Sequence, residues 1–326
     1  MPRPSYLPDN FTLALVTTVL IASLLPCKGV AAHVFNVVTN IAIAALFFFH
    51  GAKLSREAVI AGATHWRLHL LVMLCTFAMF PLLGLALKPV LAPLVTPDLY
   101  AGILFLCALP STVQSSIAFV AIARGNVPAA VCSASASSLL GIFVTPVLVG
   151  LLLATHHDGG GSWKSIGDIC MQLLVPFIAG QIARRWIGAW VDRNRGMLKY
   201  VDQGSILLVV YTAFSEAVNQ GLWQQMPLPA LAGLVVVCLV LLAVALWTTR
   251  FAARRLGFNK EDEITIVFCG SKKSLATGVP MAKVLFPVHA VGAIVLPLML
   301  FHQIQLMVCA VLAQKYAKRI VPEARP

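Results

Sequence analysis

Charged residues are scarce in this sequence, and their scarcity excludes most classes of soluble protein. Only 11% of the 326 residues are charged, whereas 59% are hydrophobic. Soluble globular domains are typically about 25% charged and about 45–50% apolar. No polar stretch is long enough to form a second, soluble domain. The composition therefore indicates one integral membrane domain that covers residues 1–326.

Acidic residues are the rarer of the two charge types. The chain has 12 Asp and Glu against 24 Lys and Arg, which gives a net charge of +12. In a soluble protein this excess would suggest a nucleic-acid partner. Basic cytoplasmic loops explain it better in a membrane protein, so we predict a lipid bilayer as the surroundings and no nucleic-acid partner.

Signatures of catalysis and of metal binding are missing. The eight cysteines form no CxxC pair and no metal-ligand spacing with His, so we interpret them as small buried hydrophobic residues and predict no metal site of that kind. The motifs HExxH, GxSxG and GxxxxGK[ST] do not occur. We predict that the protein is not an enzyme and has no cofactor. An enzyme with a lysine nucleophile is an alternative, but no acid–base partner is visible.

Apolar runs of membrane-spanning length recur along the chain. A span needs about 20 mainly apolar residues, and the sequence predicts ten of them: 11–26, 31–49, 68–87, 100–123, 127–153, 166–183, 203–221, 228–249, 264–285 and 288–313. With this count, 18 of the 24 Lys and Arg lie on one side of the membrane and 4 on the other, and the remaining two are Lys272 and Lys273 in span nine. The positive-inside rule then predicts that both termini are cytoplasmic, in what we expect to be a bacterial inner membrane.

A glycine-rich segment, HHDGGGSWKS, divides the ten spans into two halves. Repeat one covers about 11–153 and repeat two about 166–313. Because five is an odd number, two five-span halves must have opposite orientations in the membrane, which is the inverted-repeat plan of many secondary transporters. Span four then corresponds to span nine, and span five to span ten.

Span nine contains the two lysines, in the run GSKKS from Gly270 to Ser274. Each central lysine would cost about 2.5–3.5 kcal/mol if it faced lipid. Adjacent residues of a helix point about 100° apart, so an intact helix cannot direct Lys272 and Lys273 to one place. We therefore predict a break at Gly270-Ser271, where freed backbone groups can hold the ammonium groups.

Span four has a matching irregularity. Pro110 removes a backbone donor and favours a kink or break. Polar side chains gather next to it: Ser111, Thr112, Gln114, Ser115 and Ser116. A plain proline kink, with hydroxyls bonded back to carbonyls one turn earlier, is the alternative. Because the topology places this run opposite the lysines, we predict a substrate and coupling site at a crossover of spans four and nine.

Other polar residues within spans are weaker candidates. In span five, Ser133 and Ser137 share a helix face and could bind an ion or only allow close packing. Glu216 could be an interfacial residue or could take part in coupling. In span ten, His302 and Gln303, with Gln305, could form a hydrogen-bond network between helices.

Four runs together resemble a known family: GSKKSLATGVPMAKVLF, LPSTVQSSIAFVAIARGN, YTAFSEA and LPLMLFHQIQLMV. Over nearly the whole chain the sequence resembles the sodium–bile acid symporter superfamily. Within it, the sequence is closest to the SBF-like branch, which includes the vertebrate seventh member of solute carrier family 10 and bacterial relatives. The resemblance implies an all-α protein of ten transmembrane helices in two inverted five-helix repeats. Spans one, two, six and seven would form a panel domain. The others would form a core domain in which the broken helices four and nine cross.

The resemblance also implies sodium ligands, although it transfers unevenly. The family positions that bind sodium fall on Thr76, Ser115, Ser116, Ser133 and Ser137. In span nine the bile-acid branch has a Glu that contacts both sodium ions, and here that run reads Phe268, Cys269, Gly270, Ser271, Lys272. A cation therefore lies next to the position where the relatives have an anionic ligand, although Na⁺ prefers oxygen ligands.

Together these observations predict a secondary active transporter that works by alternating access. The predicted substrate is an organic anion, either bile-acid-like or steroid-like, or another amphipathic carboxylate or sulfate, and its transport would be coupled to Na⁺ or to protons. Lys272 or Lys273 would replace a bound Na⁺ or neutralise the substrate. The alternative is a membrane regulator or receptor that keeps the fold without transporting.

Overall fold

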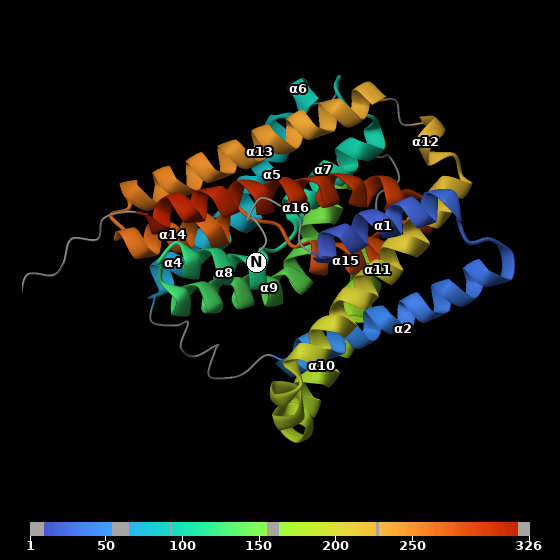
Figure 1. Cartoon of the computed structure of the whole chain (residues 1–326), viewed down its shortest axis with the longest axis horizontal. Helices are drawn as coiled ribbons and strands as arrows, with labels where there is room; N and C mark the ends of the chain where they lie inside the picture. Colours follow the sequence, from blue (N-terminus) through green and yellow to red (C-terminus); the bar gives the residue numbers. More distant parts are fainter. Residues whose placement is uncertain (1–9, 54–64, 92, 155–162, 226–227, 319–326) are drawn as a thin grey trace, which may run out of the picture.

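The chain folds into helices that pack as two groups (Figure 1). The computed structural model describes residues 10–53, 65–91, 93–154, 163–225 and 228–318, and these contain no strand. The longer helices of the first half are α1 (Asn10–Leu24), α2 (Gly29–Lys53), α4 (Trp66–Leu74), the π-helix η2 (Cys75–Met79), α5 (Phe80–Ala86), α7 (Pro97–Ala108), α8 (Gln114–Ile122) and α9 (Val127–Ala154). Those of the second half are α10 (Trp163–Arg193), α11 (Arg195–Asn219), α13 (Leu228–Arg255), α14 (Lys260–Gly270), α15 (Leu275–Leu285) and α16 (Val288–Ala317). The short helices α6 (Lys88–Leu91) and α12 (Leu222–Gln225) lie in connections.

Five helical stretches within the described ranges are long and apolar enough to cross a membrane, judged by length and composition. They are 29–53, 66–86, 127–153, 229–255 and 288–317. α1 and α7 are shorter apolar helices. The protein is thus an all-helical integral membrane protein. The count of ten spans, the inverted repeat and the orientation stay predictions, and the termini (1–9 and 319–326) and most of the glycine-rich segment lie outside the described residues.

Two apolar stretches are interrupted where the sequence places its irregularities. α7 ends at Ala108 and α8 begins at Gln114, so the Pro110 segment is not helical. α14 ends at Gly270 and α15 begins at Leu275, which leaves Ser271–Ser274 as the second interruption. These two segments are called break one (109–113) and break two (271–274) below.

The first group of helices comprises α1, α2, α10 and α11, called the panel here. α2 packs along α10, and α11 packs against α1 and α2 (Figure 1). At the crossing of α2 and α10, a Cβ added to Gly180 would lie 1.8 Å from the carbonyl oxygen of Phe48, and one added to Gly51 would lie 2.0 Å from that of Phe177. Small residues allow such close backbone approach between membrane helices. The two glycines therefore set the distance between α2 and α10.

Replacing Gly180 with alanine is expected to destabilise the panel, because the new methyl group meets backbone that cannot move aside. Overpacking of this kind costs about 1–3 kcal/mol and occasionally more. The control is Gly204→Ala in α11, where an added Cβ has no atom within 4 Å and helix propensity favours alanine by up to about 1 kcal/mol. Thermal unfolding of both variants in detergent checks this prediction. Equal unfolding midpoints for both would contradict it.

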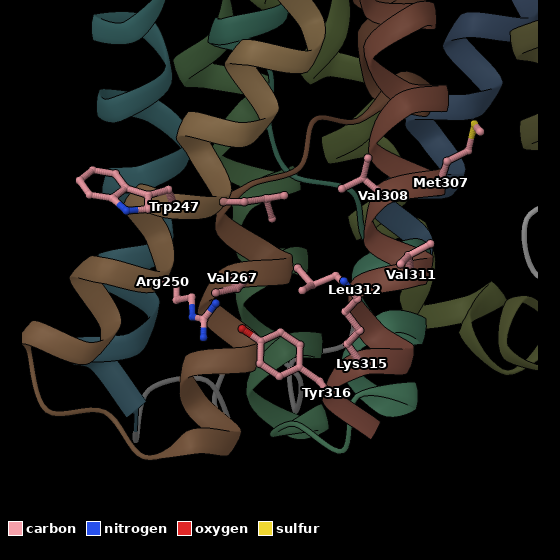
Figure 2. A pocket seen from close by; sticks show the side chains of 10 residues that line it. Trp247, Arg250, Val267, Met307, Val308, Val311, Leu312, Lys315 and Tyr316 are labelled. Carbon is pink, nitrogen blue, oxygen red and sulfur yellow. The ribbon is translucent and has the colours of Figure 1, made fainter. Parts of the chain in front are cut away.

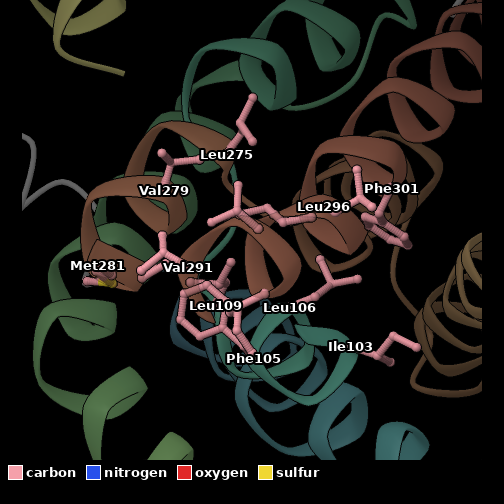
Figure 3. Close-up of a cluster of buried hydrophobic side chains, with 14 of the residues drawn as sticks. Ile103, Phe105, Leu106, Leu109, Leu275, Val279, Met281, Val291, Leu296 and Phe301 are labelled. Atoms are coloured by element: carbon pink, nitrogen blue, oxygen red, sulfur yellow. The ribbon is translucent and has the colours of Figure 1, made fainter. Parts of the chain in front are cut away.

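The second group, called the core, contains α4 to α9 and α13 to α16. α7 packs on α16 and α9, and α13 packs on α14 and α16. Figure 3 shows its apolar centre, where side chains from α7 and break one meet those of α15 and α16. The core meets the panel mainly where α15 and α16 contact α11. There Gly292 faces Ala217, and the ammonium of Lys283 on α15 donates to Oδ1 of Asn36 on α2.

Candidate functional site

Lys273 in break two is held at the centre of the core. Its side chain is fully buried. The ammonium donates hydrogen bonds to three backbone carbonyl oxygens, those of Thr76 (2.7 Å), Cys107 (2.8 Å) and Leu109 (2.7 Å). It also lies 4.2 Å from the ring centroid of Phe80, a cation–π contact. Because an ammonium has three donors, Lys273 is fully satisfied by backbone oxygens and has no donor left for a ligand.

The Thr76 carbonyl is available because of the π-helix η2. The backbone N–H of Phe80 bonds to the carbonyl of Cys75, five residues earlier, and so bypasses Thr76. The next residue, Pro81, has no N–H to offer. π-helical turns often mark functional sites, and here one frees the Thr76 carbonyl to accept a hydrogen bond from Lys273.

The other two carbonyls lie at the end of α7 (Cys107) and at the first residue of break one (Leu109), where the last carbonyls of a helix have no partner within it. The Cys107 carbonyl would normally accept from the N–H of Ser111, which instead donates to the hydroxyl of Ser137 (3.0 Å). The Ala108 carbonyl accepts from the hydroxyl of Thr145 (2.9 Å). The C-terminal end of a helix carries partial negative charge, so a cation at this end of α7 is also favoured electrostatically.

The two breaks support each other. Hydroxyls of the Pro110 segment and of α8 donate to the end of α14, and the backbone of break two donates back to break one. The contacts are Ser111 Oγ to the Cys269 carbonyl (2.5 Å), Ser116 Oγ to the Phe268 carbonyl (3.1 Å) and Ser274 N–H to the Pro110 carbonyl (2.9 Å). These contacts provide partners for polar groups at the ends of both interrupted helices, as burial in a membrane requires.

Gln305 of α16 fixes the backbone of Lys273. Its Oε1 accepts from the N–H of Lys273 (3.0 Å), and its Nε2 donates to the carbonyl of Lys273 (2.9 Å). Nε2 also lies 2.9 Å from Nδ1 of His302. The polar residues of α16 thus form a hydrogen-bond network that holds break two.

Lys272 is equally buried but differently surrounded. Its ammonium lies 4.0 Å from the ring centroid of Phe119 and 5.7 Å from that of Phe268. One long hydrogen bond, of 3.5 Å, joins it to the hydroxyl of Ser115 at the start of α8. Aromatic faces stabilise a desolvated cation by about 2 kcal/mol. Unlike carbonyl oxygens, they do not occupy the hydrogen-bond donors of the ammonium. The two lysines point to opposite kinds of environment, one made of backbone oxygens and one made of rings and a hydroxyl.

Neither lysine has an acidic partner within the described ranges, where each ion pair lies elsewhere. The buried carboxylates are Asp262 and Glu263, at the first turn of α14. No cluster of three or more His, Cys, Asp or Glu side chains in the described part could hold a metal ion. The crossover is therefore a buried site with an excess of positive charge.

The residues expected to bind sodium have other partners. The hydroxyl of Thr76 donates to the Val72 carbonyl (2.8 Å). Ser133 lies 2.7 Å from Nδ1 of His69, and Ser137 accepts from break one. Ser115 and Ser116 each bond to the hydroxyl of Thr112 (2.9 Å each). Sodium binding by these residues stays a prediction.

The secondary candidates are spread out. Glu216 lies in the last turn of α11 and accepts from Nε2 of Gln220 (2.9 Å). His302 joins the Gln305 network, and Gln303 is half-buried on the same helix. Gln114 is exposed, Ser271 bonds to the Val267 carbonyl (2.5 Å), and Gly270 packs against Cys75.

Sequence reasoning missed the aromatic and backbone groups that receive the lysines. Phe119 lies one helical turn after Ser115, and this spacing places the two side chains on one face of the helix. The spacing could therefore have indicated that Phe119 lies beside the same lysine as Ser115. Pro81 could have indicated a free carbonyl in span three. The contact of Lys283 with Asn36 was also missed, since it joins residues far apart in the sequence.

Comparison with known proteins connects this chain to one family. The model of the SBF-like CPA transporter family matches residues 9–318. The chain is 73% identical to the uncharacterized protein PA2026 of Pseudomonas aeruginosa over 98% of this chain and 96% of the relative. It is 59% identical to "Putative symporter YfeH" of Escherichia coli K12, with 95% and 93% covered. It is 31% identical to mouse "Sodium/bile acid cotransporter 7", with 93% and 90% covered. The resemblance seen in the sequence is confirmed.

Proposed function

Because the chain belongs to the SBF-like CPA transporter family, whose members are membrane transporters rather than enzymes, we propose that it is a secondary active transporter of an organic anion. The substrate class that we propose is an amphipathic carboxylate or sulfate, bile-acid-like, steroid-like or other. The panel and the core would alternate between two relative positions, and Na⁺ or protons would drive the cycle. The names of two relatives, mouse "Sodium/bile acid cotransporter 7" and "Putative symporter YfeH" of Escherichia coli, support symport.

The proposal of an anionic substrate rests on the environment of Lys272. A buried ammonium without an acidic partner is costly unless an anion accompanies it. Ser115, its hydrogen-bond partner at the start of α8, is half-buried, and the adjacent residue Gln114 is exposed. The N-terminus of a helix offers unpaired N–H groups and partial positive charge, both of which favour anions. We place the carboxylate or sulfate of the substrate between Lys272 and the first turn of α8.

Lys273 would have a different role. Its ammonium takes three carbonyl oxygens, which is the kind of ligand that a hard cation such as Na⁺ prefers. We infer that it acts as a fixed positive charge in place of a bound cation. Coupling would then depend either on Na⁺ at the remaining serine hydroxyls or on a proton carried by Lys272.

Alternating access would act on the contacts between panel and core. The described contacts join α11 to α15 and α16 and join α10 to α9 and α15, and they include the pairs Gly292–Ala217 and Lys283–Asn36. The positive-inside rule puts these two pairs toward the outer side. Opening toward the outside would separate Gly292 from Ala217 and break the Lys283 hydrogen bond.

A screen of ligand-dependent thermal stabilisation tests the proposal. Purified protein is heated with a series of bile acids, other carboxylates and sulfates, with Na⁺ and pH varied separately, and hits are followed by uptake into proteoliposomes. We expect at least one amphipathic anion to raise the unfolding temperature and to be accumulated, whereas its neutral amide analogue does neither. Stabilisation and uptake of neutral or cationic compounds alone would contradict the proposal. A shift that requires Na⁺ identifies sodium coupling, and one that depends on pH alone identifies proton coupling.

A further inference from the structure

A groove runs between α13 and α16, and none of its wall residues belongs to break one or break two. It has a volume of about 560 Å³ and opens over α14 (Figure 2). Its walls are formed by Leu246, Trp247, Arg250, Val267, Met307, Val308, Val311, Leu312, Lys315 and Tyr316. α13 lies along the edge of the core that is farthest from α2 and α10 (Figure 1). The groove therefore belongs to the outer surface of the core and not to the contact between panel and core.

The groove is divided into a polar end and an apolar end. Arg250, Lys315 and Tyr316 lie toward one end, and Trp247 and Met307 lie toward the other (Figure 2). The apolar side chains at its rim are open to the surroundings, with Trp247 66% and Met307 55% exposed. In a membrane protein such side chains face lipid. From Met307 to Lys315 the helix rises roughly 12 Å, which is enough for a substantial part of an acyl chain.

The polar end carries positive charge that the protein only partly neutralises. Glu263 is the nearby carboxylate, and it is already held by Lys260 (2.7 Å) and Arg254 (3.1 Å). Arg250 reaches it only with Nε at 3.5 Å, and the Arg250 side chain is 48% exposed. Lys315 is exposed on the facing helix. Arg250 and Lys315 thus bracket the mouth of an apolar groove with two available cations.

We propose that this groove binds one anionic phospholipid, with its phosphate between Arg250 and Lys315 and an acyl chain along Trp247, Val311 and Met307. The charge of the polar end selects the headgroup, and the length and apolar walls of the other end select the chain. Basic residues beside membrane helices bind anionic headgroups, and each contributes about a few-fold in affinity. Trp247, one turn from Arg250, fits the aromatic level at the membrane surface. With the orientation proposed above, the lipid belongs to the cytoplasmic leaflet. The binding itself does not depend on the transported substrate.

The test uses the full chain in detergent with phosphatidylglycerol or phosphatidylcholine of identical acyl chains. Lipid retention is measured by native mass spectrometry, and the unfolding temperature is measured in parallel. We expect preferential retention of phosphatidylglycerol and a higher unfolding temperature with it. In Arg250→Gln/Lys315→Gln the preference should fall about 30-fold. The matched control is Arg255→Gln/Lys318→Gln, which removes the same amount of charge near the ends of the same two helices. Neither residue lines the groove, so this variant should keep most of the preference for phosphatidylglycerol.

Two further arms separate a lipid site from general surface charge. Val311→Trp fills the groove without changing charge and should reduce retention of phosphatidylglycerol, whereas Val240→Trp, on α13 but outside the groove walls, should not. Glycerol 3-phosphate, which has the headgroup phosphate but no chain, should not compete. Any of three results would overturn the proposal. They are an equal loss of phosphatidylglycerol preference in the two double variants, unchanged retention in Val311→Trp, and full competition by glycerol 3-phosphate. If Arg250→Gln proves unstable in phosphatidylcholine, Lys315→Gln and Val311→Trp still decide the result.

Discussion

Lys273→Met is expected to lower the stability of the protein strongly, whether or not a substrate is present. Methionine keeps most of the length and the apolar stem of lysine but removes the ammonium. The carbonyls of Thr76, Cys107 and Leu109 would then lose their common donor in a site without exposure to solvent. A buried acceptor without a partner costs about 1–3 kcal/mol, and loss of one member of a buried charged network costs about 3–5 kcal/mol. The measurement is the unfolding temperature in a neutral detergent.

Lys283→Met is the matched control for this experiment. Lys283 is also a largely buried lysine in the second half of the chain, but its ammonium has one side-chain partner, Asn36, at the panel surface. We expect a clearly smaller decrease in unfolding temperature than for Lys273→Met. If both variants unfold at the temperature of the unmodified protein, the ammonium of Lys273 does not hold α7 and η2 together, and its assignment as a fixed structural cation is wrong.

The positions of the two breaks could be predicted from the sequence, because their causes are local. Pro110 cannot continue a helical hydrogen-bond pattern, and adjacent lysines cannot both be accommodated by an intact span. The helix boundaries at Ala108 and Gly270 lie where this reasoning puts them. Backbone chemistry thus decides where the apolar stretches stop being helical.

The different partners of Lys272 and Lys273 could not be predicted from local causes of this kind. It depends on which groups other helices bring to break two. The Thr76 carbonyl is freed by a change in helix type at η2, and Gln305 holds the backbone of Lys273 from 32 residues away. Phe119 reaches Lys272 from α8 only because break one and break two contact each other. Such contacts are tertiary, so residue spacing within one span does not contain them.

Lys272→Gln is expected to abolish high-affinity binding of the anionic substrate while leaving the fold nearly as stable. The ammonium of Lys272 has one long hydrogen bond and two aromatic neighbours, so the folded protein without substrate loses little when the charge is removed. Loss of one partner of a buried ion pair with the substrate costs about 2–5 kcal/mol, which corresponds to a decrease in affinity of roughly 30-fold to several thousand-fold. Ligand-induced shifts of the unfolding temperature, titrated with the anion found in the screen, measure this decrease.

Lys272→Arg is the charge-conserving control, and the two lysine positions together make the test specific. Arginine keeps the positive charge but is larger and planar, so we expect part of the affinity to return without full transport. If Lys272→Gln binds and transports the anion as the unmodified protein does, Lys272 does not neutralise the substrate. If it instead unfolds as early as Lys273→Met, its role is structural. The opposite pattern, with stability lost only at Lys273 and affinity lost only at Lys272, is what two adjacent lysines with different partners require.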